Sequence, residues 1–478
     1  MKRTVFVALF LLLLRAASVQ ISFKVQDIFG TCTLSQYGHY SSIDAIEHPI
    51  DLKQYEDNCV IRISYANDEP LKEFLLGSTS KSKSNSNSNS NITYKKWGKN
   101  NNQQTLDIQI DANSLGKLVE RFPTMVYKMV IKDLSQAVYE TFPLSKVPLI
   151  LESNNDIHSF SEEVFFKEYR DIATINSWLS LLQATYPDII KIEDIGETFE
   201  HKKLQVVHFS VPSSEIEHRE KKTVVITGGI HAREWISVST TLYLIYKLVQ
   251  LYDTWPESKM LTNLNFLFIP VFNPDGYEYT WTTDRLWRKN RQQTPVPKCF
   301  GIDIDHSYDY HWTKSSDWAC GEEYSGESPF EAFESRIWNS YLDETNQQHK
   351  ISGYIDLHSY SQEILYPYAY SCNQQPRDEE NLLELAYGIA RSIRLQSGED
   401  YQVLPACIDK DADLLPDLGS GTSLDFMYHN KAYWAYQLKL RDTGDHGFLL
   451  PSKYIEPVGN EVYAAIKYFC SFILSDER

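Results

Sequence analysis

The chain has 478 residues, of which 42% are hydrophobic, so it is long enough to bury a large core and to form more than one domain. Its formal net charge of −18 argues against nucleic acid or an anionic membrane surface as the main partner. Beyond the N-terminus, no segment is long and apolar enough to span a bilayer, so we expect no membrane span. We also expect a monomer.

The N-terminus, MKRTVFVALFLLLLRAASVQ, has the pattern of a secretory signal peptide. Lys2 and Arg3 supply positive charge, residues 5–14 are apolar, and small residues follow at 16–18. We therefore predict a signal peptide over residues 1–20. The mature chain is then expected to be secreted or held in the secretory pathway.

The cysteines suit an oxidising compartment, which would pair most of them. They occupy positions 32, 59, 299, 320, 372, 407 and 470. An odd number leaves at least one unpaired, and Cys470, inside an apolar helical run, is the expected buried thiol. The sequence leaves the pairing of Cys32, Cys59 and Cys470 open, with Cys32–Cys59 as one hypothesis.

Residues 21–150 alternate short strand-like runs with two helical runs, which predicts a small α+β domain. The helical runs are SLGKLVERF and DLSQAVYETF, and their expected caps are Ser114 and Asp133. Residues 78–93 form a Ser- and Asn-rich insert that cannot bury a core. This insert contains a sequon at Asn91, a predicted glycosylation site.

A predicted linker, residues 151–164, leads to residues 165–478, where buried strands alternate with longer helices. TVVITGG and LNFLFIPVFNPDG are continuous apolar runs closed by turn residues, which is typical of inner strands in a sheet covered on both faces. ENLLELAYGIARSI has one apolar helical face. SPFEAFESRIW predicts a capping box between Ser328 and Glu331, with Pro329 at the first helical position. The alternation predicts an α/β domain whose chemistry lies where strands end.

Three potential metal ligands stand at such strand ends. TVVITGGIHAREW places His231 and Glu234 in the loop after one strand, and ISGYIDLHSYSQ places His358 at the end of another. Two imidazoles and one carboxylate, with a fourth position left to water, are the ligand set of a catalytic zinc site. Alone, an HxxE pair is weak, because about one would occur by chance in a chain of this size. The alternative is a pair of loop histidines that bond to the backbone.

Longer motifs surround these residues: GGIHAREWIS, PVFNPDGYEYTW, DRLWRKNR, LHSYSQEILYPY and LRDTGDHGFLLP. Together they resemble the M14 zinc carboxypeptidases of the A/B type, and VYKMVIKDLSQAVYE resembles the end of that family's activation prodomain. The resemblance implies a mixed eight-stranded sheet between helices, behind an α+β prodomain that covers the active site. It implies one Zn²⁺ per chain on His231, Glu234 and His358. It also implies the disulfides Cys299–Cys320 and Cys372–Cys407.

The resemblance also assigns residues to a substrate pocket. Arg288, in DRLWRK, matches the arginine that stabilises the developing oxyanion, and Arg233, in HAREW, matches a subsite arginine. Ser359 and Tyr360 belong to the same pocket. Leu424, in GTSLDF, falls where the family's specificity residue lies, and its apolar character would favour apolar C-terminal side chains.

The residue at the general-base position departs from the family's pattern. The family has a Glu two residues before Arg-Asp-Thr-Gly, and this chain has Lys439. A carboxylate there takes a proton from metal-bound water and passes it to the leaving amine, which typically contributes about 10²–10⁴-fold. An ammonium has no lone pair for this step. A buried, neutral lysine could act as a base, but it would compete to ligate the metal.

The residues that hold the substrate's C-terminal carboxylate in this family, called the clamp below, depart from the pattern as well. The family's Asn-Arg pair is replaced by Asp305 and His306 in GIDIDHSYDYHW. Asp305 presents only acceptors to an anionic terminus, and His306 lacks a bidentate fork, so the pocket would suit a cationic group better. The family's mobile tyrosine aligns with Asp417.

We therefore expect a zinc-binding pseudoenzyme. It resembles a fungal group of inactive carboxypeptidase-like proteins, associated with cell-wall organisation, whose base is likewise Lys. Two alternatives stay open: an active metallocarboxypeptidase that releases C-terminal residues by an altered mechanism, and a non-catalytic binding protein of the secretory pathway. The expected partner is a peptide or protein C-terminus, or another small ligand in the pocket.

Overall fold

The structure is a computed structural model that describes residues 50–77, 92–100, 103–143, 164–212, 221–345, 350–409 and 420–475. The chain divides into two compact units, Met1–Tyr139 and Glu140–Arg478. The predicted signal peptide, Cys32, the sequon at Asn91, Asp417 and all but the last residue of the predicted linker lie outside the described residues.

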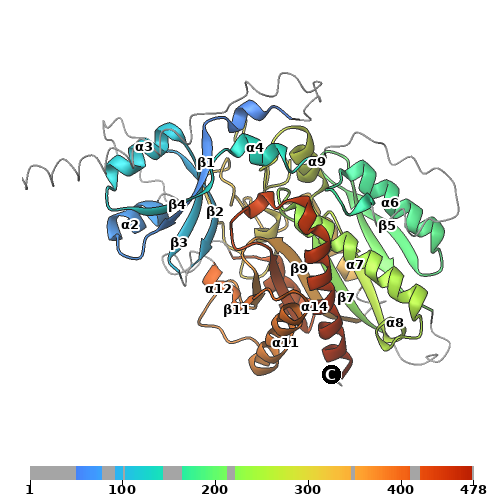
Figure 1. Ribbon diagram of the computed structural model, residues 1–478. Helices are drawn as coiled ribbons and strands as arrows, with labels where there is room; N and C mark the ends of the chain where they lie inside the picture. The colour runs from blue at the N-terminus through green and yellow to red at the C-terminus, as the bar shows by residue number, and fades with distance from the viewer. Residues whose placement is uncertain are drawn as a thin grey trace, which may run out of the picture. The chain divides into compact units, whose positions relative to one another are not determined.

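The first unit contains a four-stranded antiparallel sheet with the strand order β2-β3-β1-β4 (Figure 1). Its elements are η2 (Leu52–Tyr55), β1 (Asn58–Ser64), α2 (Glu69–Gly77), β2 (Tyr94–Asn100), β3 (Thr105–Asp111), α3 (Ala112–Arg121), β4 (Val126–Ile131) and α4 (Leu134–Tyr139). Alternate residues of β1 and β3 share one face of the sheet and form a core with α2 and α3. This core includes Ile61, Ile63, Leu71, Leu75, Ile108, Ile110, Leu115 and Leu118.

The second unit contains the predicted mixed eight-stranded sheet, with the strand order β11-β10-β12-β9-β7-β8-β6-β5. The strands are β5 (Ile190–Glu197), β6 (Lys203–Phe209), β7 (Lys222–Gly228), β8 (Leu264–Ile269), β9 (Lys350–Ser359), β10 (Glu363–Tyr366), β11 (Gln402–Pro405) and β12 (Trp434–Leu440). The four central strands, β12, β9, β7 and β8, run parallel. Their carboxyl ends therefore meet at one edge of the sheet.

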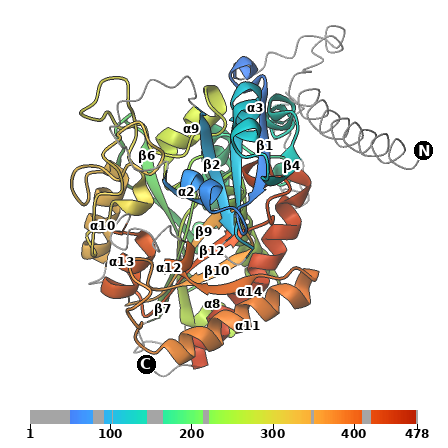
Figure 2. The same ribbon diagram turned by 90° about the vertical axis from the view of Figure 1, so that its left-hand side faces the viewer.

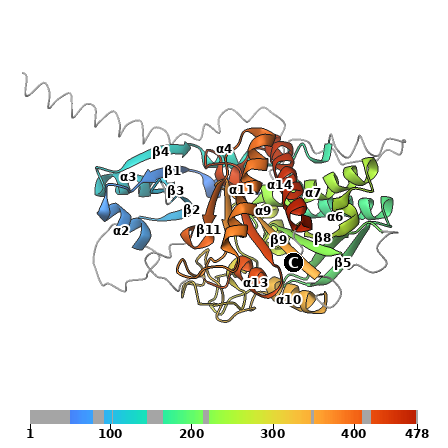
Figure 3. The ribbon, with the colours of Figure 1, turned by 90° about the horizontal axis from the view of Figure 1, so that it is seen from below.

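Helices cover both faces of this sheet, which explains why its central strands read as continuous apolar runs. Figures 2 and 3 show α11 and α14 on one side and α10 and α13 on the other. The helices are α6 (Ile172–Thr185), α7 (Trp235–Thr254), α8 (Lys259–Asn263), α9 (Pro274–Thr282), α10 (Phe333–Thr345), α11 (Glu379–Ser397), α12 (Ala406–Asp409), α13 (Ser423–Asn430) and α14 (Ile455–Ser475), with short 3-10 turns η3 (Ile304–His306), η4 (Gly447–Leu449) and η5 (Ser452–Tyr454). Within the described residues, no helix has the length and apolar character needed to cross a membrane.

Three helix starts show how local chemistry sets the boundaries. Asp133 caps α4 as predicted, but the cap of α3 is Asp111 rather than Ser114. The Asp111 carboxylate accepts a hydrogen bond from the backbone N–H of Ser114 at 2.9 Å. The sequence NPDG, predicted as a turn, instead begins α9, where Asn273 Oδ1 accepts from the N–H of Gly276 at 2.9 Å.

The predicted capping box between Ser328 and Glu331 is not formed, because α10 begins at Phe333. Phe330 has a φ of 55°, and a residue in that left-handed region cannot belong to a right-handed helix. The Glu331 carboxylate instead accepts from the backbone N–H of Glu327 at 2.5 Å.

Both predicted disulfides of the second unit, Cys299–Cys320 and Cys372–Cys407, are present. Cys470 is the buried free thiol that the apolar helical run predicted, and burial raises its pKa. The apolar face predicted for α11 is also confirmed. Its buried members are Leu382, Leu385, Ala386, Ile389 and Ile393.

The close approach of α14 to β9 gives a prediction of stability. A Cβ atom built on Gly353 would lie 2.5 Å from Cζ of Phe469. We expect Gly353→Ala to lower the free energy of unfolding by about 1–3 kcal/mol, because the core has no room for the methyl group. Urea unfolding of the two single variants and of the double variant with Phe469→Leu measures the energetic coupling between these positions. If Gly353→Ala lowers the free energy of unfolding equally with and without Phe469→Leu, this account is contradicted.

Candidate metal centre

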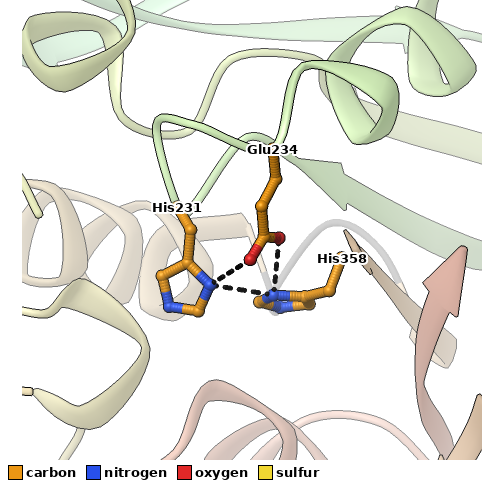
Figure 4. Close-up of side chains that lie close together, drawn as sticks. All are labelled: His231, Glu234 and His358. Atoms are coloured by element: carbon orange, nitrogen blue, oxygen red, sulfur yellow. Dashed lines mark hydrogen bonds and ion pairs between the residues drawn. The ribbon is translucent and has the colours of Figure 1, made fainter. Parts of the chain in front are cut away.

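The parallel pairing of β7 with β9 brings the three predicted ligands together. Gly228 lies opposite Leu357 in the two strands, so the loop after β7 and the end of β9 meet at one edge of the sheet. That loop carries His231, and Glu234 is the residue immediately before α7. His358 is the penultimate residue of β9. The three side chains point toward one another (Figure 4).

Backbone contacts fix the loop after β7. Gly229 has a φ of 70°, and a Cβ there would lie 2.7 Å from a methyl group of Val238, so the position requires glycine. The N–H of Gly229 donates to the Ser237 hydroxyl at 3.0 Å. Asn273 donates its side-chain amide to the carbonyl of Ile230 at 3.1 Å. These bonds hold the loop that presents the first two ligands.

The geometry of the three ligand groups fits one tetrahedral metal ion. Nδ1 of His231 lies 3.0 Å from Oε1 of Glu234 and 3.2 Å from Nδ1 of His358. Nδ1 of His358 lies 3.2 Å from Oε2 of Glu234. Metal–ligand bonds of 2.0–2.1 Å at tetrahedral angles place donor atoms about 3.3 Å apart. Because each of the three residues is at most 4% exposed, water competes little for these donors.

Each ligand histidine is oriented by a buried carboxylate that sequence analysis missed. Nε2 of His231 lies 3.2 Å from Oδ1 of Asp303, and Nε2 of His358 lies 3.0 Å from Oδ2 of Asp356. With its proton on Nε2, each imidazole donates a hydrogen bond to its carboxylate, and the Nδ1 lone pair is then directed at the metal position. Asp303 is in turn held by Arg288, whose Nη2 lies 2.8 Å from Oδ2.

Buried charges of opposite sign set the protonation of this centre. Burial alone would raise the pKa of Glu234, but His231 and His358 hold it well below its usual range. Burial alone would lower the pKa of His358, but Asp356 and Glu234 raise it well above its usual value. A metal ion at Nδ1 of His358 would therefore compete with a proton, and its affinity would fall as the pH falls.

Lys439 stands beside the metal centre and is paired with an acid from the neighbouring strand. It lies opposite His358 in the parallel pairing of β12 with β9. It also lies opposite Glu363 in the antiparallel pairing with β10. Its Nζ is 3.8 Å from Oε2 of Glu363, and the two side chains are 17% and 7% exposed. The position that the resemblance assigns to a proton acceptor therefore holds an ion-paired ammonium group.

The two predicted substrate arginines are engaged within the chain. Arg233 is buried, its Nη1 lies 3.0 Å from Oε2 of Glu322, and its guanidinium lies 4.1 Å from the centre of the Phe448 ring. Arg288 bonds to Asp303 through both Nε and Nη2. A substrate carboxylate would have to compete with these internal acids.

The residues at the clamp position are placed in η3. Asp305 Oδ1 accepts from the Ser423 hydroxyl at 2.6 Å and from its N–H at 3.2 Å. Burial would raise the pKa of Asp305, but the nearby His358 is the main cause that lowers it to about 2. His306 is half-buried, and Leu424 is buried at the start of α13.

The remaining predicted pocket residues lie next to the ligands. The N–H of Ser359 donates to Oε2 of Glu234 at 3.0 Å. Tyr360 is buried, with its ring 5.1 Å from that of Phe448. Asp417 lies outside the described residues.

Some of the missed residues carried a signal in the sequence. Asp356 stands two residues before His358 in an apolar strand, and residues i and i+2 of a strand share a face. Asp303 lies in the same short segment as Asp305. Glu363 carried no such signal, because its role depends on the pairing of β10 with β12.

Comparisons with known proteins agree with this geometry. The family described as zinc carboxypeptidase matches residues 175–465. A Saccharomyces cerevisiae protein named "Inactive metallocarboxypeptidase ECM14" is 51% identical over 80% of this chain and 87% of that protein. A protein of the same name from Ajellomyces dermatitidis is 36% identical over 92% of this chain and 75% of that protein. The solved structure of thrombin activatable fibrinolysis inhibitor matches with a TM-score of 0.73 and 25% identity, over 88% of this chain and all of that one.

The cross-strand position of Lys439 predicts the effect of reversing its charge. In the metal-free protein, Lys439→Glu would set two carboxylates opposite each other. We expect its free energy of unfolding to lie about 1 kcal/mol below that of Lys439→Gln. Combining Lys439→Glu with Glu363→Gln should remove this difference in urea unfolding. Equal stability of the two single variants would show that the cross-strand pair does not contribute.

Proposed function

Because the chain belongs to the zinc carboxypeptidase family, we propose that it is a zinc-binding member that does not hydrolyse peptide bonds. One observation carries the proposal: the ligands and their orienting carboxylates are complete, whereas Lys439 stands in an ion pair at the general-base position. Peptide hydrolysis there needs a group that accepts a proton from water and returns it to the leaving amine. An ammonium group paired with Glu363 accepts no proton.

The donor set supports zinc as the bound metal. His231, Glu234 and His358 would hold the ion, and two neutral imidazoles with one carboxylate are a common zinc ligand set. When bound, zinc supplies a Lewis acid that polarises a carbonyl or acidifies a water molecule. In this chain its contribution is to stability, because an ion that binds only the folded state joins the β7 loop to the end of β9.

Substrate recognition is weakened by the changes at the clamp and by the internal bonds of the two arginines. A bidentate arginine at the clamp would grip a terminal carboxylate, and His306 cannot replace it. Arg233 and Arg288 already bond to internal acids. We propose that the partner is a peptide or protein C-terminus held without cleavage, or another small ligand. The names of the two fungal relatives support the absence of activity.

The N-terminal sequence supports a proposal for location. We propose that residues 1–20 direct the chain into the secretory pathway, toward the vacuole or cell wall, where it takes part in cell-wall organisation. We further propose that Asn91 is glycosylated and that residues 21–150 are an activation-type prodomain. The two disulfides support an oxidising compartment. Glycosidase treatment tests both the entry into the secretory pathway and the glycosylation of Asn91. We expect it to shift the electrophoretic mobility of the wild-type chain but not that of Asn91→Gln. A wild-type chain whose mobility does not shift would contradict both proposals.

The proposed function is tested by metal content and peptide hydrolysis of the purified full chain. We expect about one zinc ion per chain and no residue released from peptides with varied C-termini. Glu234→Gln should lose zinc, whereas the matched control Lys439→Gln should keep it. Turnover that disappears in Lys439→Met would instead establish the altered-mechanism enzyme. A stable fold without zinc would favour the non-catalytic binding protein.

Restoring the general base alone should not restore activity. We expect Lys439→Glu to leave kcat/KM for a C-terminal leucine peptide indistinguishable from that of Lys439→Gln. Asp305 and His306 still lack the clamp's bidentate contact, and Glu363 then repels the new carboxylate. Strong recovery in Lys439→Glu would show that the lost base is the whole cause of inactivity.

A further inference from the structure

A buried series of polar contacts links the former clamp position to a metal ligand. Nε2 of His358 lies 3.0 Å from Oδ2 of Asp356. The same carboxylate oxygen lies 2.9 Å from the Ser423 hydroxyl, which in turn lies 2.6 Å from Oδ1 of Asp305. All four residues are at most 4% exposed. This series of contacts therefore runs from η3 through α13 to β9 among buried residues.

The carboxylate of Asp356 is held from both sides. Its Oδ1 accepts from the Thr227 hydroxyl of β7 at 2.7 Å, while Oδ2 faces Ser423 and His358. Because the imidazole ring turns to keep its bond to Asp356, the place of this carboxylate sets the direction of the His358 lone pair. Ser423 is thus in a position to determine how the ligand meets the metal.

Asp305 is suited to hold Ser423. Its Oδ1 accepts both the hydroxyl and the backbone N–H of Ser423, so one oxygen fixes the first residue of α13 at two points. The single hydroxyl hydrogen can serve only one carboxylate at a time, which couples the positions of Asp305 and Asp356. Oδ2 of Asp305 faces the side-chain amide of Gln437 at 3.5 Å.

Two other interpretations of Asp305 compete with this one. The sequence alone suggests an acceptor for a cationic ligand, but Oδ1 is already occupied by Ser423. The ligand atoms of Asp305, Asp356 and His358 also lie within 4.8 Å of one another, as in a second metal site. The Ser423 hydroxyl between the two carboxylates accounts for that spacing without an ion.

We propose that Asp305 and Ser423 are positioning residues for the metal centre, acting on His358 through Asp356. The clamp position has then become part of the internal support of the metal ligand. The inference rests on the proposed zinc binding. The inference goes beyond zinc binding because it assigns a structural role to Asp305, whose position has lost its role in the clamp.

The test compares zinc affinity, by chelator competition, with the absorption spectrum of the cobalt-substituted protein, which reports ligand geometry. We expect Ser423→Ala and Asp305→Ala each to weaken zinc binding about 10-fold or more and to alter the cobalt spectrum. Asp305→Asn keeps an acceptor oxygen for Ser423 and should retain most of the affinity.

A matched control separates positioning from general loss of stability. The buried Ser258 hydroxyl accepts from the N–H of Leu261 at 3.4 Å in the cap of α8, just before β8 begins and so at the opposite end of the parallel strands. Ser258→Ala should lower the melting temperature of the metal-free protein and leave zinc affinity and the cobalt spectrum unchanged.

The outcomes distinguish the inference from the proposed function. A wild-type chain that binds no zinc refutes the proposed function. A wild-type chain that binds zinc, with the affinity and spectrum of Ser423→Ala and Asp305→Ala unchanged, refutes the inference alone. More than one zinc ion per chain, reduced in Asp305→Ala, would overturn it in favour of a second metal site. An Asp305→Asn variant as weak as Asp305→Ala would also overturn it.

Discussion

The metal centre depends on two buried hydrogen bonds between carboxylates and histidines. Asp303 and Asp356 each accept a hydrogen bond from Nε2–H of a histidine, so both Nδ1 lone pairs converge on one point beside Glu234. Without these acids the rings could rotate or present the wrong tautomer. Asp303 lies just before η3 and Asp356 lies in β9, and the surrounding fold also supplies hydrogen-bond partners for both acids.

Charge compensation explains how a lysine can stand so close to this centre. An unpaired charge in a buried site is costly, and removing one partner of a buried pair typically costs about 3–5 kcal/mol. Here Arg288 bonds to Asp303, Arg233 to Glu322, and Lys439 approaches Glu363. The last pair joins adjacent strands, so the charge introduced at the base position is balanced on its own face of the sheet. The fold can therefore accommodate Lys439 with its metal ligands in place.

The sequence predicted those parts of the site that depend on local pattern. Continuous apolar runs place strand ends next to His231 and His358, and parallel neighbours bring such ends together. Glu363 could not be predicted in this way, because its role follows from the order of β10, β12 and β9 in the sheet. The failed capping box has a similar cause: tertiary contacts hold Phe330 at positive φ, and the local signal at Ser328 is overridden.

The proposed loss of catalysis and the proposed binding of zinc are compatible because they depend on different strands. The ligands and their carboxylates belong to the loop after β7, to the residue just before η3 and to β9, whereas the base position belongs to β12. A substitution on β12 therefore replaces a group beside the site without replacing any residue that would hold the metal. The clamp is different, since Asp303 immediately precedes η3 and Asp305 lies within it. A change at Asp305 alters a residue that bonds to α13 and, through Ser423, reaches Asp356. The two departures from the family's pattern therefore have unequal consequences under the proposed function: Lys439 would remove a reaction step, while Asp305 would support the position of a metal ligand.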